Sequence, residues 1–182
     1  MNEMLARIYA VLQPILPKKF DENEWYTLFI SGLMVLVFVY IYRRNDVLLK
    51  TEIVFILLLN LLFTTVGDYF LAMPPYDFYD TVDRNSGEIA DILLQNIVYP
   101  IPVCVMVYYY QKLMPNVVLF IILCASMLLC LEWISVKYFH LFSYNTWKLW
   151  YSYLFYVLTM WLNLFFFQKF HLFVIQLRKQ KA

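Results

Sequence analysis

The sequence predicts an all-α fold: a polytopic membrane bundle of about five transmembrane helices, preceded by an amphipathic helix at the membrane surface. The first observation is composition, because 63% of the 182 residues are hydrophobic, only 15% are charged, and the mean hydropathy is +0.64. A soluble domain usually has about 25% charged and about 45–50% apolar residues, since it must cover its core with polar surface. Hydrocarbon is therefore the expected solvent of this chain.

The second observation is the length of the apolar stretches. A helix needs about 20 mostly apolar residues to cross a hydrocarbon core about 30 Å thick. The stretches lack the alternation of barrel strands, and helices close their backbone hydrogen bonds within each segment. The five predicted spans cover residues 25–42, 53–73, 92–111, 117–139 and 149–167.

Charged residues and prolines mark the ends of these spans. Arg43 and Arg44 follow the first span, and Glu52 precedes the second, which ends at the Pro74–Pro75 pair. Lys112 closes the third. Because the chain contains no internal repeat, low-complexity tract or linker, we expect residues 1–182 to form one membrane domain.

Residues 1–20 have the pattern of a helix that lies on the membrane surface. Their apolar side chains recur at a helical period, with Glu3, Arg7 and Gln13 elsewhere on the helical wheel. Pro14 and Pro17 end the pattern. A signal peptide would need a basic start, a longer apolar run and a small-residue cleavage site, so we expect this segment to be retained. The apolar set is Met4, Leu5, Ile8, Tyr9, Val11, Leu12, Ile15 and Leu16.

Several classes of function are disfavoured by composition. The net charge of +1 argues against nucleic acid as a partner. The three glycines leave little room for a phosphate-binding loop, and the three cysteines have neither zinc-site nor disulfide spacing. His140 and His171 are expected near opposite membrane faces, which disfavours a haem or a buried zinc site. We therefore expect no cofactor.

The distribution of basic residues predicts the orientation. With the N-terminus outside and the C-terminus inside, eight Lys and Arg residues lie on the inner side and six on the outer side. The acidic loop 74–91 then lies outside. The inner set is Arg43, Arg44, Lys50, Lys112, Lys169, Arg178, Lys179 and Lys181, and the outer set is Arg7, Lys18, Lys19, Arg84, Lys137 and Lys148.

Ionisable side chains at membrane depth are candidate site residues, because they are costly unless paired or hydrated. In an up-and-down bundle several of them fall at one depth near the outer surface. Asp91, Gln95 and Tyr99 also recur at i, i+4 and i+8, so they share one face of the third helix. Pro100 and Pro102 should kink that helix. The predicted polar pocket consists of Asp68, Asp91, Gln95, Tyr99, Glu132 and Lys137.

A structural interpretation of the same polar groups stays open. Amides such as Asn60 and Asn163 can join helices by hydrogen bonds. Trp147 and many of the 16 tyrosines lie near span ends, where amphipathic rings prefer the membrane interface. Glu132 either pairs with a group on another helix or is protonated, because desolvation disfavours the charged form.

The acidic loop contains a candidate metal site. Asp77, Asp80 and Asp83 are spaced by three, which on a helix or turn could gather carboxylate oxygens around Mg²⁺ or Ca²⁺. The spacing differs from that of an EF-hand, whose ligands occupy alternate positions before a central glycine. A solvated acidic loop is the preferred interpretation.

The order of features from Phe63 to Phe170 resembles a family of small five-span integral membrane proteins of spore-forming Gram-positive bacteria, which has no established activity. Relatives often have proline where Trp133 stands here. The resemblance implies a bacterial plasma-membrane location. The residues that carry it are Asp68, Asp91, Tyr99-Pro100, Tyr108-Tyr109-Tyr110-Gln111, Ala125-Ser126, Leu131-Glu132-Trp133 and Trp147-Lys148-Leu149-Trp150-Tyr151-Ser152.

The leading hypothesis is a non-enzymatic protein that binds a lipid, a small ligand or a partner helix in the polar pocket near the outer leaflet. Lys137 would neutralise one carboxylate. Expected partners are membrane lipid, a second copy of the chain or another membrane protein. One alternative is a lipid- or isoprenoid-modifying enzyme with Glu132 as general acid and Asp68 or Asp91 stabilising cationic charge. A small transporter subunit is the other, although the chain lacks paired broken helices in two halves.

Overall fold

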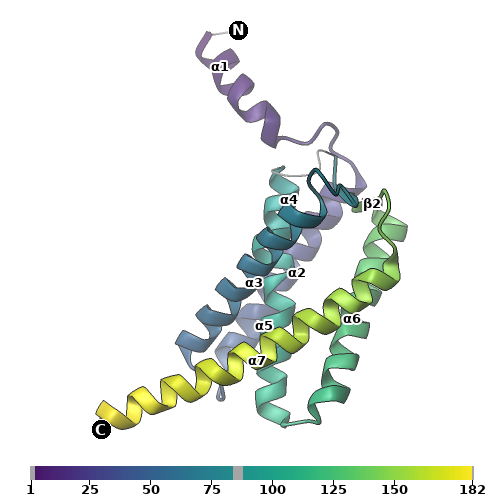
Figure 1. The fold of residues 1–182 in the computed structure, drawn as a ribbon. Coiled ribbons are helices and arrows are strands. Elements are labelled where there is room, and N and C mark those ends of the chain that lie inside the picture. Colours follow the sequence, from purple (N-terminus) through teal and green to yellow (C-terminus); the bar gives the residue numbers. More distant parts are fainter. Residues whose placement is uncertain (1–2, 84–87, 182) are drawn as a thin grey trace.

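The computed structural model describes residues 3–83 and 88–181 of the chain. Within these residues, five helices are long and apolar enough to cross a membrane, which confirms the all-α bundle. The spans run alternately between two ends of the molecule (Figure 1). In chain order the elements are α1 (Glu3–Leu12), η1 (Gln13–Ile15), α2 (Glu22–Arg44), α3 (Lys50–Leu71), β1 (Tyr79–Thr81), α4 (Ile89–Leu93), η2 (Leu94–Val98), α5 (Pro100–Leu113), α6 (Val117–Phe139), β2 (Phe142–Tyr144) and α7 (Leu149–Lys181).

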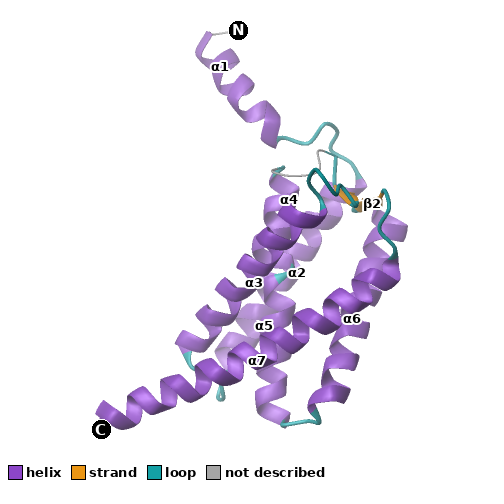
Figure 2. Ribbon diagram, in the orientation of Figure 1, coloured by secondary structure: helices purple, strands orange, loops and turns teal. Residues whose placement is uncertain are grey.

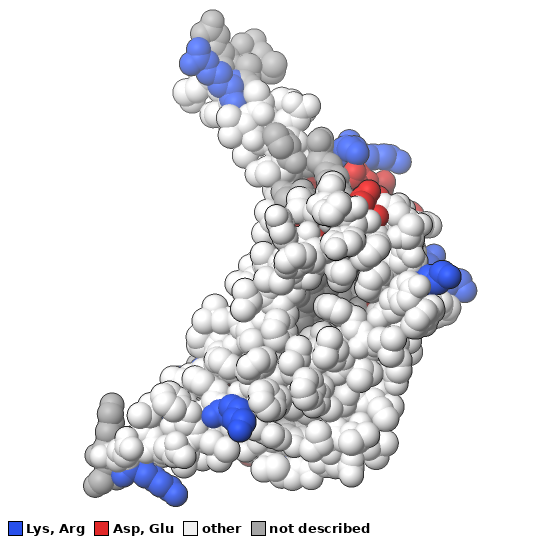
Figure 3. Space-filling view, in the orientation of Figure 1, with Lys and Arg blue, Asp and Glu red and all other residues white. Residues whose placement is uncertain are grey.

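The two ends of the bundle differ in structure and charge. At the strand end, β1 and β2 pair (Figure 2). At the basic end, α2 finishes with Arg43 and Arg44, and α5 carries Lys112 in its last turn. On the face that Figure 3 shows, charged side chains lie toward these two ends and the surface between them is uncharged. This distribution suits a body surrounded by hydrocarbon.

The helix of the predicted fifth span continues beyond the predicted end of that span. It stops at residue 167, whereas α7 continues without a break to Lys181 and extends past the other helices at the basic end (Figure 1). Residues 168–181 contain neither proline nor glycine, so charged residues such as Lys169 and Arg178 interrupt the apolar stretch without ending the helix. For the first four spans, each predicted end lies within three residues of the observed one.

The third span is built from α4, the π-helical turn η2 and α5. At this turn Tyr99 N donates to Leu94 O at 3.0 Å, five residues back. Pro100 and Pro102 follow directly and have no backbone N–H to donate. At the position of the expected kink the helix contains a widened, π-helical turn. Such turns are often found at functional sites.

The core forms around α5, against which α2, α3 and α7 pack, while α6 packs mainly against α7. Val107, Ile56 and Met160 are fully or almost fully buried there. In the middle of the bundle, Asn60 of α3 and Asn163 of α7 exchange hydrogen bonds of 2.7 and 3.0 Å between their side-chain amides. These amides join two helices, as their structural interpretation predicts.

Helices α3 and α7 are also held together toward the basic end. The rings of Phe55 and Phe170 stack with their centroids 4.2 Å apart. The buried Glu52 accepts hydrogen bonds from His171 Nδ1 at 2.5 Å and from Leu49 N at 2.7 Å. From this junction the two helices diverge toward the strand end (Figure 1).

At the strand end, β1 and β2 tie the loop after α3 to the loop after α6. The strands are antiparallel, with Tyr79 opposite Tyr144 and Asp80 opposite Ser143. The carbonyl of Phe78 accepts backbone hydrogen bonds of 3.0–3.1 Å from the three residues 145–147. The sequence shows no alternating pattern at either strand, and neither was predicted. We call residues 78–81 and 142–147 the strand cap.

Helix α1 has the predicted amphipathic sequence and projects away from the bundle at the strand end (Figure 1). Apolar side chains of this helix that the structure describes are exposed, Met4 by 70% and Val11 by 76%. Residues 1–2 of the predicted segment lie outside the described residues, as does Arg84 of the predicted outer basic set.

Candidate functional site

A cavity of about 190 Å³ lies in the half of the bundle nearer the strand cap. Side chains from α2, α3, α6, α7, the third span and the strand cap line it. In Figure 3 the surface is hollowed where α3 and the first half of α7 diverge. Apolar side chains such as Met34, Phe63 and Leu128 form most of the wall, and carboxylates and hydroxyls gather toward the cap.

Glu132 is the centre of the first polar group in this cavity. It lies on α6, is only 9% exposed, and accepts hydrogen bonds from three hydroxyls. Ser152 and Tyr156 of α7 donate at 2.7 Å each, and Tyr144 of β2 donates the third. Trp147 Nε1 in turn donates to Ser152 Oγ at 2.8 Å. One carboxylate thus connects α6 to α7 and to the strand cap.

Asp68 is the centre of the second polar group. Its carboxylate, on α3, accepts a hydrogen bond from Tyr79 OH at 2.8 Å and one from Gln95 Nε2 at 2.6 Å. The same Gln95 nitrogen lies 2.9 Å from Asp91 Oδ2. The side-chain amide of η2 therefore bridges two carboxylates, and it holds the third span against α3.

The strand cap connects the two groups. Tyr79 and Tyr144 are opposite each other in the β1–β2 register, and each donates to one carboxylate of the cavity. Burial, followed by the nearby Asp68 carboxylate, raises the pKa of Tyr79 above its ordinary value. Burial and then Glu132 do the same to the pKa of Tyr144. Both phenols therefore stay protonated and act as donors.

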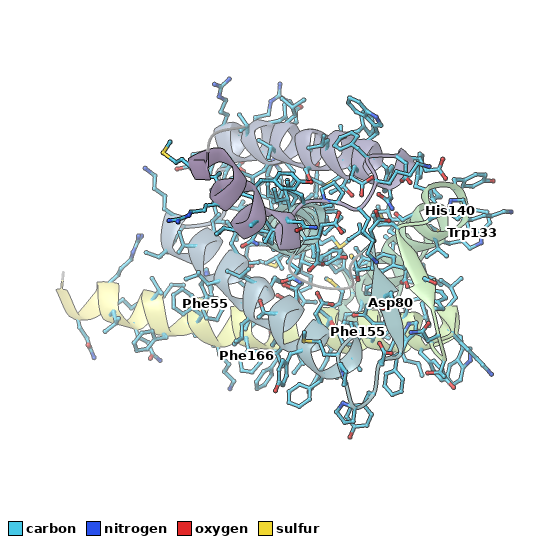
Figure 4. All side chains as sticks on the ribbon, turned by 90° about the horizontal axis from the view of Figure 1, so that it is seen from above. Phe55, Asp80, Trp133, His140, Phe155 and Phe166 are labelled. Atoms are coloured by element: carbon cyan, nitrogen blue, oxygen red, sulfur yellow. The ribbon has the colours of Figure 1, made fainter. Side chains whose placement is uncertain are left out.

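A third contact closes the cavity between α2 and α6. Tyr26 OH and Ser135 Oγ lie 2.9 Å apart, and the ring of Tyr26 stacks on Phe139 with centroids 4.0 Å apart. Near this point His140 Nδ1 lies 2.8 Å from Glu22 Oε1. Gly67 of α3 and Phe155 of α7 both line the cavity, and a Cβ on Gly67 would meet Phe155 Cζ at 3.7 Å. Figure 4 shows Phe155 on α7.

Most of the predicted pocket residues are brought together. Asp68, Tyr99 and Glu132 line the cavity, and Gln95 and Asp91 join the group through Asp68. These five belong to three separate spans. Their common depth, which the up-and-down arrangement predicts, is the reason that they meet.

Lys137 does not belong to this group. It is exposed, and its Nζ lies 4.8 Å from the ring centroid of Trp133 and 5.5 Å from that of Tyr138. Trp133 lies at the periphery of the bundle (Figure 4). The prediction that Lys137 neutralises a pocket carboxylate is therefore wrong. Lys137 follows Glu132 by five residues, which places it on another face of α6.

The three candidate metal ligands of the acidic loop do not converge. Asp80 accepts from Asn145 Nδ2 at 3.2 Å, Asp83 accepts from Lys19 N at 3.0 Å, and Asp77 is exposed. Strand β1 covers only Tyr79–Thr81, so Asp77 and Asp83 lie outside the strand that contains Asp80. Among the described residues, no group of three or more His, Cys, Asp or Glu side chains could hold a metal ion.

Four hydroxyl donors were not among the predicted site residues. Ser152 and Tyr156 are four apart on α7, so their shared helical face was a usable signal. Tyr79 and Tyr144 lie in loops, where helical periodicity gives no information. All three tyrosines match the pattern of membrane-interface residues, although their hydroxyls contact buried carboxylates.

No family model, no curated protein and no solved structure matches this chain. The resemblance to five-span proteins of spore-forming bacteria therefore stays a prediction. Function has to be inferred from the cavity itself.

Proposed function

We propose that this chain is an integral membrane protein that binds a small amphiphile in the cavity next to the strand cap. The amphiphile could also be part of a larger lipid, namely its polar head with the first few carbons. The observation that carries the proposal is the division of the cavity into two parts. Asp68, Glu132 and their hydroxyl partners form a polar part near the cap, and the rest of the wall is apolar. Ligand pockets commonly combine an apolar wall with a few polar groups.

The size of the cavity supports a small ligand or part of a larger one. Its volume of about 190 Å³ is close to that of an engineered apolar cavity of about 150 Å³ that binds benzene. A polar head and its first few carbons would fit. A longer chain would have to continue along the apolar part of the wall, which includes Met34, Phe63 and Leu128.

We place the cavity in the outer half of a bacterial plasma membrane. The basic residues of the described chain that flank the spans favour a cytoplasmic basic end, and the sequence resemblance supports the bacterial membrane. Membrane-impermeant maleimide should label Ser143→Cys but not Asp46→Cys in intact cells, in a Cys130→Ser background. The opposite pattern would reverse the orientation.

Binding is favoured over the enzymatic alternative by the hydrogen bonding of Glu132. Its partners Tyr144, Ser152 and Tyr156 are all hydroxyls that donate to it. A general acid must instead donate a proton to its substrate. The carboxylate is used as an acceptor that organises the cavity.

A glycine substitution tests the proposal. Gly67 lines the cavity, and a Cβ there would be in ordinary van der Waals contact with Phe155 Cζ at 3.7 Å. We therefore expect the larger side chain of Gly67→Leu to take up part of the cavity volume while α3 stays helical. Native mass spectrometry of the purified protein should show a bound amphiphile on the wild type and its loss in this variant. Gly32→Leu is the matched control, because Gly32 is a helical glycine with nothing within 4 Å of its Cβ. Equal retention by both variants would refute the proposal.

A further inference from the structure

We infer that the amphiphile bound in this cavity carries a positively charged head, such as an alkylammonium group. The inference rests on the proposed function and specifies its ligand. It follows from the charge of the cavity wall, from the rings around the carboxylates and from the volume available.

The wall of the cavity has acidic side chains without basic ones. Asp68 and Glu132 line it, and its described lining contains no Lys, Arg or His. The four ion pairs found in the described part of the chain, two of them made by histidines, involve other carboxylates: Asp21, Asp46, Glu22 and Glu52. Lys137, the cation expected to serve this site, faces Trp133 and Tyr138 instead.

The low-dielectric environment of the two carboxylates favours a positively charged ligand. A carboxylate in a low-dielectric interior loses much hydration free energy, and hydrogen bonds from neutral donors offset only part of that loss. A cation in the cavity would offset more, because two carboxylates act on it in the same medium. An anionic head would be repelled by both. The negative charge of the cavity wall therefore favours a cationic ligand over an anionic one.

Aromatic side chains add to this selection. Tyr79, Tyr99, Tyr144, Trp147 and Tyr156 all line the cavity near the carboxylates. The faces of such rings attract organic cations, and quaternary ammonium ligands are often held by several rings together. A bare divalent metal ion suits this wall less well. It prefers six or more oxygen ligands, whereas most of this wall is apolar.

The volume limits the head to a compact group. About 190 Å³ accommodates a trimethylammonium group and a few methylene groups, with the remaining chain directed along the apolar wall that includes Met34, Phe63 and Leu128. Two sources share this chemistry: the amine of a phospholipid head, and a free amphiphilic ammonium ion. The experiment below separates them.

The test compares three probes with the same hexyl chain on the full-length protein in a non-ionic maltoside detergent. Isothermal titration calorimetry should show binding of hexyltrimethylammonium, and weaker binding, by at least about tenfold, of hexanol and hexyl sulfate. Displacement by dihexanoyl phosphatidylethanolamine would identify a lipid head as the source, and its failure to compete would identify a free amphiphile. This comparison needs no variant, so it does not depend on the folding of one.

Two substitutions test whether the carboxylates of Asp68 and Glu132 bind the cation. Asp68→Asn and Glu132→Gln should each weaken hexyltrimethylammonium binding by about tenfold or more, while Glu22→Gln, an exposed carboxylate outside the cavity, should leave it unchanged. Binding of hexanol or hexyl sulfate as tightly as the cation, with loss of both in Gly67→Leu, would overturn the cationic ligand and leave the amphiphile pocket intact. Absence of binding by every probe would overturn both.

Discussion

At the scale of single residues, Glu132 organises the cavity because its neighbours are all donors. Tyr144 comes from β2, and Ser152 and Tyr156 come from α7. Sequence reasoning identified Glu132 and Asp68 from the cost of burying a carboxylate in a membrane. It missed Tyr79 and Tyr144, since a loop has no periodicity from which a side-chain direction can be deduced. It misplaced Lys137, which rings on the outer face of α6 hold away from the cavity.

Replacing Glu132 with alanine should destabilise the protein. The substitution leaves three buried hydroxyls without their acceptor, and we expect a loss of about 2–4 kcal/mol in the free energy of unfolding. Unfolding of the purified protein in mixed micelles with increasing dodecyl sulfate measures this change. Glu22→Ala, which removes an exposed carboxylate of the same end, should have little effect. A Glu132→Ala variant as stable as Glu22→Ala would contradict the hydrogen-bond arrangement.

At the scale of elements, the strand cap forms the end of the cavity wall, because Tyr79, Tyr144 and Trp147 line the cavity. Composition and apolar length predict the helices well, because a span must bury its whole length in hydrocarbon. The same reasoning does not predict β1 and β2, since each strand has only three residues and pairs with a segment more than sixty residues away. The turn η2 was expected only as a proline kink, whereas it places Gln95 between Asp68 and Asp91.

The register of the strand cap is open to a direct test. Asp80 and Ser143 are opposite each other, and paired residues of antiparallel strands have Cα atoms about 4.5–5.5 Å apart, a distance that a disulfide spans. In a Cys130→Ser background, Asp80→Cys with Ser143→Cys should therefore form an intramolecular disulfide under mild oxidation. Mass spectrometry of digested protein detects the bridge. Asp77→Cys with Ser143→Cys is the control and should not crosslink, and a reversed result would reject this register.

At the scale of the whole molecule, the arrangement separates a tightly packed half from an open one. Toward the basic end α3 and α7 are joined by Phe55 with Phe170 and by Glu52 with His171, and the Asn60–Asn163 pair marks the middle of the bundle. Toward the strand end the same helices diverge (Figure 1), and residues of both helices there line the cavity. The number and order of the spans predict the depth at which the polar groups meet. They do not predict the volume left between the helices, which depends on crossing angles and side-chain packing.

The most direct measurement of the central claim is photolabelling of the full-length protein in nanodiscs with an alkylammonium amphiphile that carries a diazirine near its head. Digestion and mass spectrometry should place the label on cavity-lining segments of α6 and α7, around Glu132 and Phe155, and Gly67→Leu should abolish it while Gly32→Leu does not. Label confined to the exposed residues Leu119, Leu123 and Met127 of α6, unaffected by Gly67→Leu, would show that the amphiphile contacts only the lipid-facing surface and would contradict the account.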